Sequence, residues 1–145
     1  MSADDAERIA RAAFNGIRAQ FPAFTFVEET DAPVEISIVV PVQVGLKFQV
    51  WLALQNVDEL HFSVEGRLWL RWFPCTDPAR VAEFVDAVSG LLSGRYRVLE
   101  QLRFGRCLKA ELQAPEGEGW KTLAGRSFIH LPVPGFRTFR ELRNT

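Results

Sequence analysis

Ionisable and polar side chains recur at alternate positions in one stretch of this chain. They are His61, Ser63, Glu65, Arg67 and Arg71. Because alternate residues of a strand share a face, neighbouring strands would bring such groups within reach of one another. A histidine beside a carboxylate could carry out general acid–base chemistry, and two arginines could hold a carboxylate or a phosphate. The same residues also suit a solvated, salt-bridged sheet face, so a small enzyme and a binding surface both stay open.

The polar side of this stretch also carries two tryptophans, Trp51 and Trp69. The opposite side is apolar and is predicted to be the core face, with Leu46, Phe48, Val50, Leu52, Leu54, Leu60, Phe62, Val64, Leu68, Leu70 and Trp72. Aromatic rings among cations are typical of contact surfaces. We therefore predict a ligand- or partner-binding face that consists of Trp51, His61, Glu65, Arg67, Trp69 and Arg71.

The two tryptophans allow three interpretations, because large aromatic side chains are usually well covered. The tail 132–145 or the segment 115–125, which includes Trp120, could cover them within the same molecule. A homodimer could bury them between two copies of the sheet. They could also line a site for a small ligand.

The remaining residues with reactive groups favour structural roles. Cys75 precedes a predicted helix whose N-terminus would lower a thiol pKa, but no local motif surrounds it, and only His61 and His130 could act as its base. The cysteines and histidines lack the paired spacing of a zinc site. Phosphate-loop, dinucleotide and hydrolase-elbow motifs are absent. We assign no catalytic residue, cofactor or metal ligand, and we favour a protein that is not an enzyme.

Composition and charge are those of an ordinary globular protein, with 48% hydrophobic and 24% charged residues in 145, so one domain over 1–145 is expected. The sequence has neither a bilayer-length apolar run nor a signal-peptide pattern, which favours a cytoplasmic protein without a membrane partner. Net charge is −1, but residues 61–145 hold 13 basic and 9 acidic residues. That arginine-rich half could bind an acidic partner, while the acidic total and the lack of an RNA-binding motif argue against nucleic acid.

Apolar residues at spacings of three and four predict two main helices. The first begins after Ser2, a plausible N-cap, and runs to residue 20. The second has Asp77 as its N-cap and Pro78 in its first turn, and it ends at Gly94. Their apolar faces are expected to cover the core face of the sheet through Ile9, Ala13, Ile17, Val81, Phe84, Val85 and Val88.

The rest of the chain reads as strands and turns. Strands are predicted at 24–29, at 34–40, between 46 and 73, at 95–104 and 106–113 with a bulge near 99–100, and at 126–131. A helical alternative near 98–102 stays open. We predict the α+β class: a mostly antiparallel β-sheet of 5–8 strands with two main helices on one face, in the order α-β-β-β-β-β-α-β-β-(β)-(α). The tail 132–145 has apolar residues at helical spacing and is expected to dock on the domain.

The predicted order of elements, helix, meander, helix and hairpin, resembles that of small bacterial chaperone and regulator domains such as those of type III secretion. This resemblance lies in element order alone and implies an adaptor- or chaperone-like role. On the evidence of the open, aromatic and arginine-bearing sheet face, we expect an interaction protein that binds a protein partner or itself through that face. The alternative is a small-molecule-binding domain or small enzyme with a His/Glu/Arg site on that face.

Overall fold

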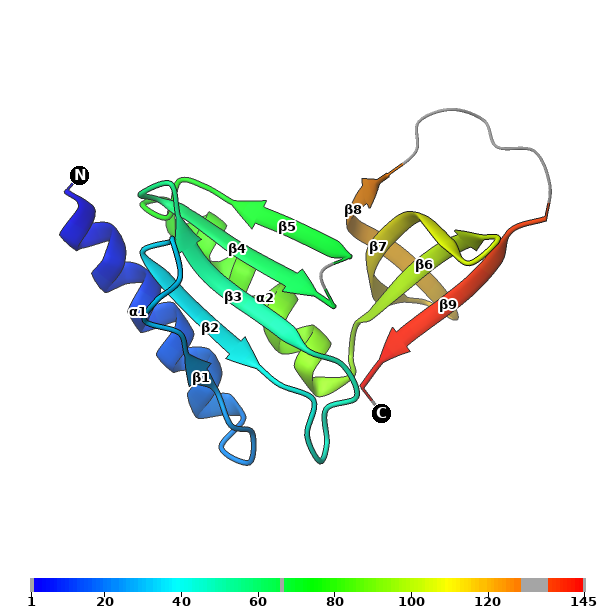
Figure 1. Cartoon of the computed structure of the whole chain (residues 1–145), viewed down its shortest axis with the longest axis horizontal. Helices are drawn as coiled ribbons and strands as arrows, with labels where there is room; N and C mark the ends of the chain where they lie inside the picture. Colours follow the sequence, from blue (N-terminus) through cyan, green and yellow to red (C-terminus); the bar gives the residue numbers. More distant parts are fainter. Residues whose placement is uncertain (1, 66, 129–135, 145) are drawn as a thin grey trace.

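The computed structural model describes residues 2–65, 67–128 and 136–144. In chain order the elements are α1 (Ala3–Gln20), β1 (Val27–Glu28), β2 (Ile36–Val40), β3 (Val50–Gln55), β4 (Glu59–Val64), β5 (Leu68–Trp72), α2 (Pro78–Ser93), β6 (Arg97–Arg103), β7 (Arg106–Glu116), β8 (Gly119–Ser127) and β9 (Thr138–Arg143). Figure 1 shows two lobes, one with both helices and a five-stranded sheet, the other a four-stranded sheet. The predicted α+β class with antiparallel strands is confirmed.

Both helices begin and end at the residues that the sequence indicated. The Ser2 side chain accepts a hydrogen bond from the backbone N–H of Asp5 at 3.2 Å. In α2 the Asp77 carboxylate accepts the N–H of Ala79 at 2.9 Å, and Gly94 ends the helix with a φ of 82°. Glycine adopts this left-handed conformation without the steric cost of a Cβ atom, which explains the stop at Gly94.

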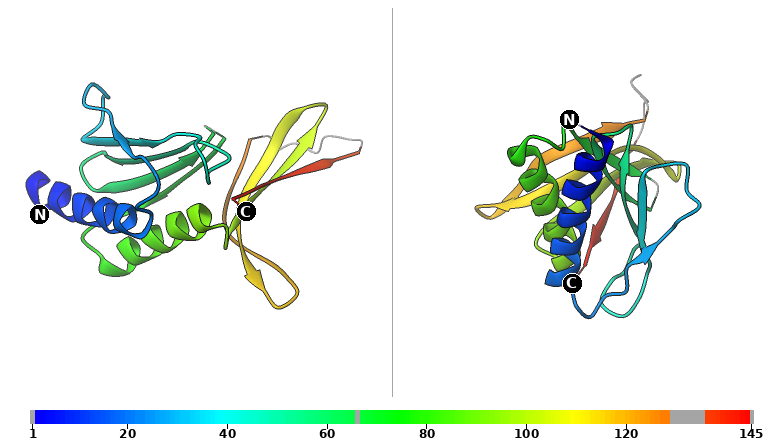
Figure 2. Two further views of the ribbon diagram at one scale, coloured as in Figure 1. Left: turned by 90° about the horizontal axis from the view of Figure 1, so that it is seen from below. Right: turned by 90° about the vertical axis from the view of Figure 1, so that its left-hand side faces the viewer.

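The first sheet has the strand order β1-β2-β3-β4-β5, with every pair antiparallel. Both helices cover the same face of this sheet (Figure 2). The predicted core face is confirmed, because ten of its eleven residues are buried and the last, Trp72, is half-buried and packs against the core. Of the helical residues expected to meet it, Ile9, Val81 and Val85 are only half-buried. They lie toward the groove between the helices rather than toward the sheet.

The second sheet has the order β8-β7-β6-β9, and its inner face joins the same cluster of buried apolar residues through Val98, Ala110 and Leu112. The predicted hairpin at Gly105 is confirmed, but its bulge lies between Gln101 and Leu102, not near 99–100. The shared cluster agrees with a single domain, which stays a prediction.

The C-terminal tail differs from its expected form. Its apolar residues have helical spacing, but residues 138–143 form a strand, β9, which pairs with β6. Residues 132–135 and 145 lie outside the described residues. Phe139 is 60% exposed and Phe136 is 97% exposed. The edge of β6 offers backbone donors and acceptors along its whole length, and pairing with it outweighs the weak helical preference of the tail. The strand expected at 126–131 is the end of β8 up to Ser127, and 129–131 are outside the described part.

A buried carboxylate connects the two lobes. Glu100 on β6 is 0% exposed and lies 2.7 Å from an Nη atom of Arg67, just before β5 in the first lobe. Arg140 on β9 lies 3.7 Å from its other oxygen. A carboxylate removed from water needs such cations, so the position of the second sheet depends on this contact.

Phe84→Ala should lower the free energy of unfolding by about 3–5 kcal/mol, because Phe84 is fully buried and packs edge-on against Phe14 and Trp72. Chemical denaturation measures this loss. The control is Phe104→Ala, since Phe104 is 89% exposed, and it should change stability by less than about 0.5 kcal/mol. Equal losses in both variants would contradict the described core.

Arg67→Met should destabilise the protein by roughly 2–3 kcal/mol, because it leaves the buried Glu100 carboxylate with Arg140 alone. Arg71→Met is the matched control, four residues further along the chain on β5. Arg71 lies 3.7 Å from Glu59 in a more exposed position, and its loss should cost less than about 1 kcal/mol. Denaturation curves of both variants provide the comparison. Similar costs for the two would mean that Glu100 does not need Arg67.

Candidate functional site

The face of the first sheet that the helices leave uncovered carries the candidate site. The strand register places Trp51, Ser63 and Trp69 in one row across β3, β4 and β5. The next row holds Ala53, His61 and Arg71. Bulky aromatic residues therefore flank a small residue in one row, which leaves room for the rings to fold over the sheet.

The two indoles form a compact aromatic pair. The ring centroids of Trp51 and Trp69 are 5.5 Å apart at an interplanar angle of 85°, and His61 meets Trp69 edge-on at 5.9 Å. Beneath them Ala53, His61 and Ser63 are buried although neither α1 nor α2 lies on this side. We call the surface formed by Trp51, His61, Trp69, Arg71 and Phe73 the tryptophan face. Phe73 is 50% exposed and lies under the Arg71 guanidinium, 5.2 Å from it.

Hydrogen bonds within the sheet hold both indoles in place. The Trp51 Nε1–H donates to the Ser37 hydroxyl at 2.7 Å, and that hydroxyl donates to Glu29 at 3.0 Å. Trp69 Nε1–H donates to His61 Nδ1 at 2.7 Å. Since an indole N–H can only donate, Nδ1 accepts, and the imidazole of His61 is neutral. Its Nε2–H then donates to Glu59 at 3.0 Å.

The electrostatics of the face agree with this assignment. Burial lowers the pKa of His61, and the nearby Arg71 cation lowers it further, while the hydrogen bond and charge of Glu59 oppose them. Burial tends to raise the pKa of Glu59, but hydrogen bonds from Asn56 and His61 and the positive charge of Arg71 outweigh it, so the carboxyl pKa is lowered. Glu59 is therefore ionised at neutral pH, when His61 is not.

The structure brings together four of the six residues predicted for this face: Trp51, His61, Trp69 and Arg71. Glu65 has a φ of 55° in the turn after β4, which breaks the alternation, and its carboxylate accepts the N–H of Gln49 at 3.2 Å. Arg67 reaches Glu100 in the second sheet instead. The expected His61–Glu65 pair does not form, and both ring nitrogens of His61 are already bonded.

Three residues that support the face were not among the predicted ones: Glu29, Ser37 and Glu59. Glu59 lies two residues before His61 on the same strand, so period two alone could have selected it as the carboxylate partner. Ser37 lies on the polar side of β2, and only the pairing of β2 with β3 shows that it meets Trp51. Strand order is the information that the sequence did not supply.

Neither of the segments proposed to cover the tryptophans within the molecule does so in the described residues. The described part of the tail forms β9 in the second sheet. Trp120 lies against the guanidinium groups of Arg97 and Arg143, which are 4.3 and 5.0 Å from its ring. Trp69 accordingly remains 40% exposed.

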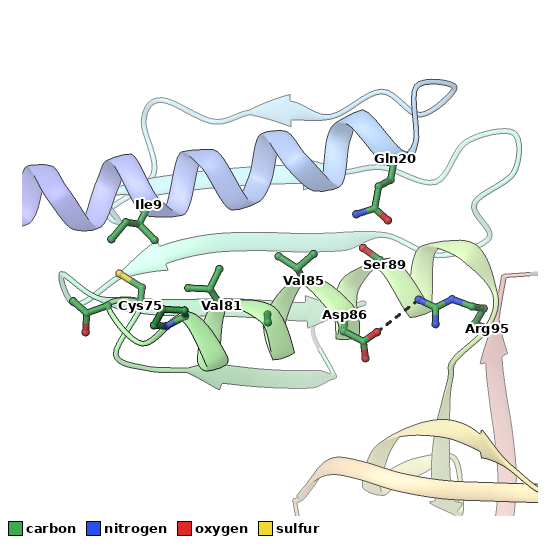
Figure 3. Close-up of a pocket in the computed structure, with 11 residues that line it drawn as sticks. Ile9, Gln20, Cys75, Val81, Val85, Asp86, Ser89 and Arg95 are labelled. Carbon is green, nitrogen blue, oxygen red and sulfur yellow. Dashed lines mark ion pairs between the residues drawn. The ribbon is translucent and has the colours of Figure 1, made fainter.

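A groove of about 630 Å³ lies on the other side of the first lobe, between α1 and α2 (Figure 3). Its walls are apolar, with Ile9, Val81 and Val85, and the Asp86–Arg95 ion pair lies at one end. Cys75 lines it as well, but this side chain is 1% exposed, and burial raises the pKa of its thiol. A thiol in this state is a poor nucleophile, which favours the structural role.

The described residues contain neither a candidate metal site nor a candidate membrane-spanning helix. No group of three or more His, Cys, Asp or Glu side chains in the described ranges is arranged to hold a metal ion. None of the helices in the described part of the chain has the length and apolar character needed to cross a bilayer.

Stability should decrease as the pH falls below 6.5, the ordinary pKa of histidine, because the unfolded chain binds a proton there that the folded chain resists. The loss should continue down to the lowered pKa of folded His61, and Glu59 adds a separate loss below 4.5. In His61→Asn the side-chain oxygen still accepts from Trp69, but the group no longer titrates. Denaturation at several pH values should therefore give this variant a shallower slope just below pH 6.5, and an unchanged slope would contradict the neutral His61.

No protein-family model, curated protein or solved structure matches this chain. Its function is therefore inferred from the positions and contacts of its own side chains.

Proposed function

We propose that this protein is a non-enzymatic interaction protein that binds a protein partner through the tryptophan face, and that a second copy of the chain is the partner this face fits best. The observation that carries the proposal is the pair of tryptophans on the sheet face that the helices leave uncovered, each held by a hydrogen bond to a neighbouring side chain. Tryptophan and arginine are the side chains most often found at the energetic centre of protein interfaces.

The two indole N–H groups need no hydrogen-bond acceptor from a partner. Each N–H is already bonded, to Ser37 and to His61, so a partner can cover the rings without leaving a donor unsatisfied. The same bonds fix the ring orientations, which reduces the side-chain entropy that association would otherwise cost. A rigid apolar patch with a polar rim is the usual anatomy of a protein interface.

The charges around the face favour a second copy. On the β5 side lies Arg71, whose side chain is 59% exposed. On the β1–β2 side lie the exposed acids Glu29 and Glu35. A two-fold axis that lies in the contact plane and runs parallel to the strands places each side of the face against the opposite side of its partner, so these acids would meet Arg71 in both halves of the contact. This arrangement makes the face complementary to itself.

The alternative of an enzyme or ligand-binding site on this face has less support. His61 is 4% exposed, and its two nitrogens are engaged by Trp69 and Glu59. Glu65 and Arg67, which would complete such a site, point elsewhere. A general base needs access to the proton that it removes, and this imidazole has none in the folded protein.

Light scattering over a range of protein concentrations tests the proposal. Wild-type protein should reach the mass of two chains, whereas Trp69→Ser should weaken association by about 30-fold or more, the effect of losing an interface hot spot of about 2 kcal/mol. Val44→Ser is the control, because Val44 is 98% exposed and lies outside the tryptophan face. A wild-type protein that keeps the 16.4 kDa mass of one chain throughout would remove the second copy as partner.

A charge exchange in the same assay locates the contact. The Arg71→Glu variant and the Glu35→Arg variant should each have the mass of one chain, because each substitution places like charges opposite one another. An equal mixture of the two variants should associate again, since every mixed pair restores opposite charges. Failure of the mixture, with both variants folded, would exclude the proposed two-fold arrangement.

A further inference from the structure

The second lobe differs in charge from the first. Residues 1–94 hold 13 acidic and 7 basic residues, and residues 95–145 hold 5 acidic and 10 basic ones. Because Gly94 ends α2, this division coincides with the boundary between the lobes. The net charge of −1 thus conceals a basic lobe of about +5, eight of whose ten cations are arginines.

The basic residues concentrate in a row at the outer end of this lobe. Arg103 on β6 lies directly opposite Arg106 on β7, and continuing the β6–β9 register by one residue from Leu102 and Thr138 places Arg137 on the other side. Arg137 donates to Gln101 at 2.9 Å, which puts its side chain on the same outer face as Arg103. We call Arg103, Arg106 and Arg137 the arginine row. Like charges in adjacent strand positions repel one another, so the row has a cost within the protein.

The arginine row lacks anionic partners within the described part of the chain. None of its three members forms an ion pair there, although Arg67, Arg97 and Arg140 in the same region all do. The Nε and one Nη of Arg103 are buried and have no hydrogen-bond acceptor among the described residues. Buried donors of a cation without acceptors are unfavourable, and a phosphate oxygen is an acceptor that suits guanidinium geometry.

Exposed phenylalanines surround the arginine row. Phe139 lies on the same outer face, opposite Gln101, and is 60% exposed. Phe104 is 89% exposed at the tip of the β6–β7 hairpin, which lies away from α1 (Figure 1), and its φ is 49°. A bulky side chain in that conformation is a strained exception in a turn where Asn or Asp is usual. Backbone strain and an exposed ring at one position are a reason to look for a function.

We propose that the arginine row and its phenylalanines bind single-stranded nucleic acid. The arginines would contact phosphates, and Phe104 and Phe139 would stack on bases, the combination by which sequence-tolerant binding of single strands is achieved. The aromatic composition favours this ligand over an acidic peptide: the exposed large hydrophobic residues of the described second lobe are phenylalanines except for Leu123. The expectation against nucleic acid followed from the acidic total and from the lack of an RNA-binding motif. The division into lobes replaces the total charge with that of the basic lobe, and sequence-tolerant binding of single strands does not require such a motif.

Fluorescence anisotropy of a labelled oligothymidylate of about 12 nucleotides, measured at several salt concentrations, tests the proposal on the full chain. The wild type should bind with an affinity that falls as salt rises. Arg103→Gln/Arg106→Gln should bind at least about tenfold more weakly and reduce the salt slope by about 1.4, two phosphate contacts at about 0.7 each. The matched control, Arg8→Gln/Arg18→Gln, makes the same charge change on the first lobe and should bind as the wild type does.

Phe139→Ala separates stacking from charge, whereas Phe104 also supports the Arg103 guanidinium, which lies 4.8 Å from its ring centroid. The Phe139→Ala variant should weaken binding by about tenfold or more and leave the salt slope unchanged, because it removes a ring and no cation. An unchanged affinity in this variant, or equal competition by polyglutamate or by duplex DNA, would overturn the proposal in favour of a general anion surface. Thermal unfolding confirms that each variant is folded. The tryptophan face is untouched by these changes, so the oligomeric mass should not move with them.

Discussion

The structure depends on one constraint: a five-stranded sheet has two faces, and the two helices cover only one of them. Period-two alternation sends every large aliphatic residue of β3, β4 and β5 toward the helices, and the sheet is thereby fixed in register. The uncovered face cannot then be filled by the helices. It is closed instead by its own side chains, with two indoles laid over small residues and bonded to Ser37 and His61.

The second lobe is held by a contact of a different kind. Its apolar inner face adds to the common core, but its placement also relies on the buried Glu100 carboxylate and the arginines on either side of it. Ionic contacts of this type are directional, so they fix the position of a lobe more narrowly than apolar packing alone. Two surfaces of opposite character are thus kept at defined places on one chain, an aromatic face on the acidic lobe and a basic end on the other.

Much of this arrangement could be predicted from the sequence, and the failures have definite physical causes. Helix caps at Ser2 and Asp77 and the core face follow from local chemistry and periodicity, which are strong signals. Glu65 and Arg67 were misplaced because the turn after β4 ends the alternation with a positive φ at Glu65; Gly66 indicates a turn or a bulge at this point, but not where the neighbouring side chains go. The pairing of β9 with β6 joins positions as distant as Arg97 and Arg143, and local patterns carry no information about such contacts.

That same pairing determines how the second sheet can assemble. Strands β6, β7 and β8 are joined by short hairpin turns and can form from neighbours in the sequence, whereas β9 must return across the whole lobe to reach β6. Contacts of such long range form late because closing the loop costs entropy before the strand pairing compensates for it. Until then β6 presents an unpaired backbone edge, which is a template for strand addition by another molecule. β9 covers this edge in the folded lobe and becomes the edge strand itself, where Arg140, Glu141 and Arg143 place charges that oppose strand addition.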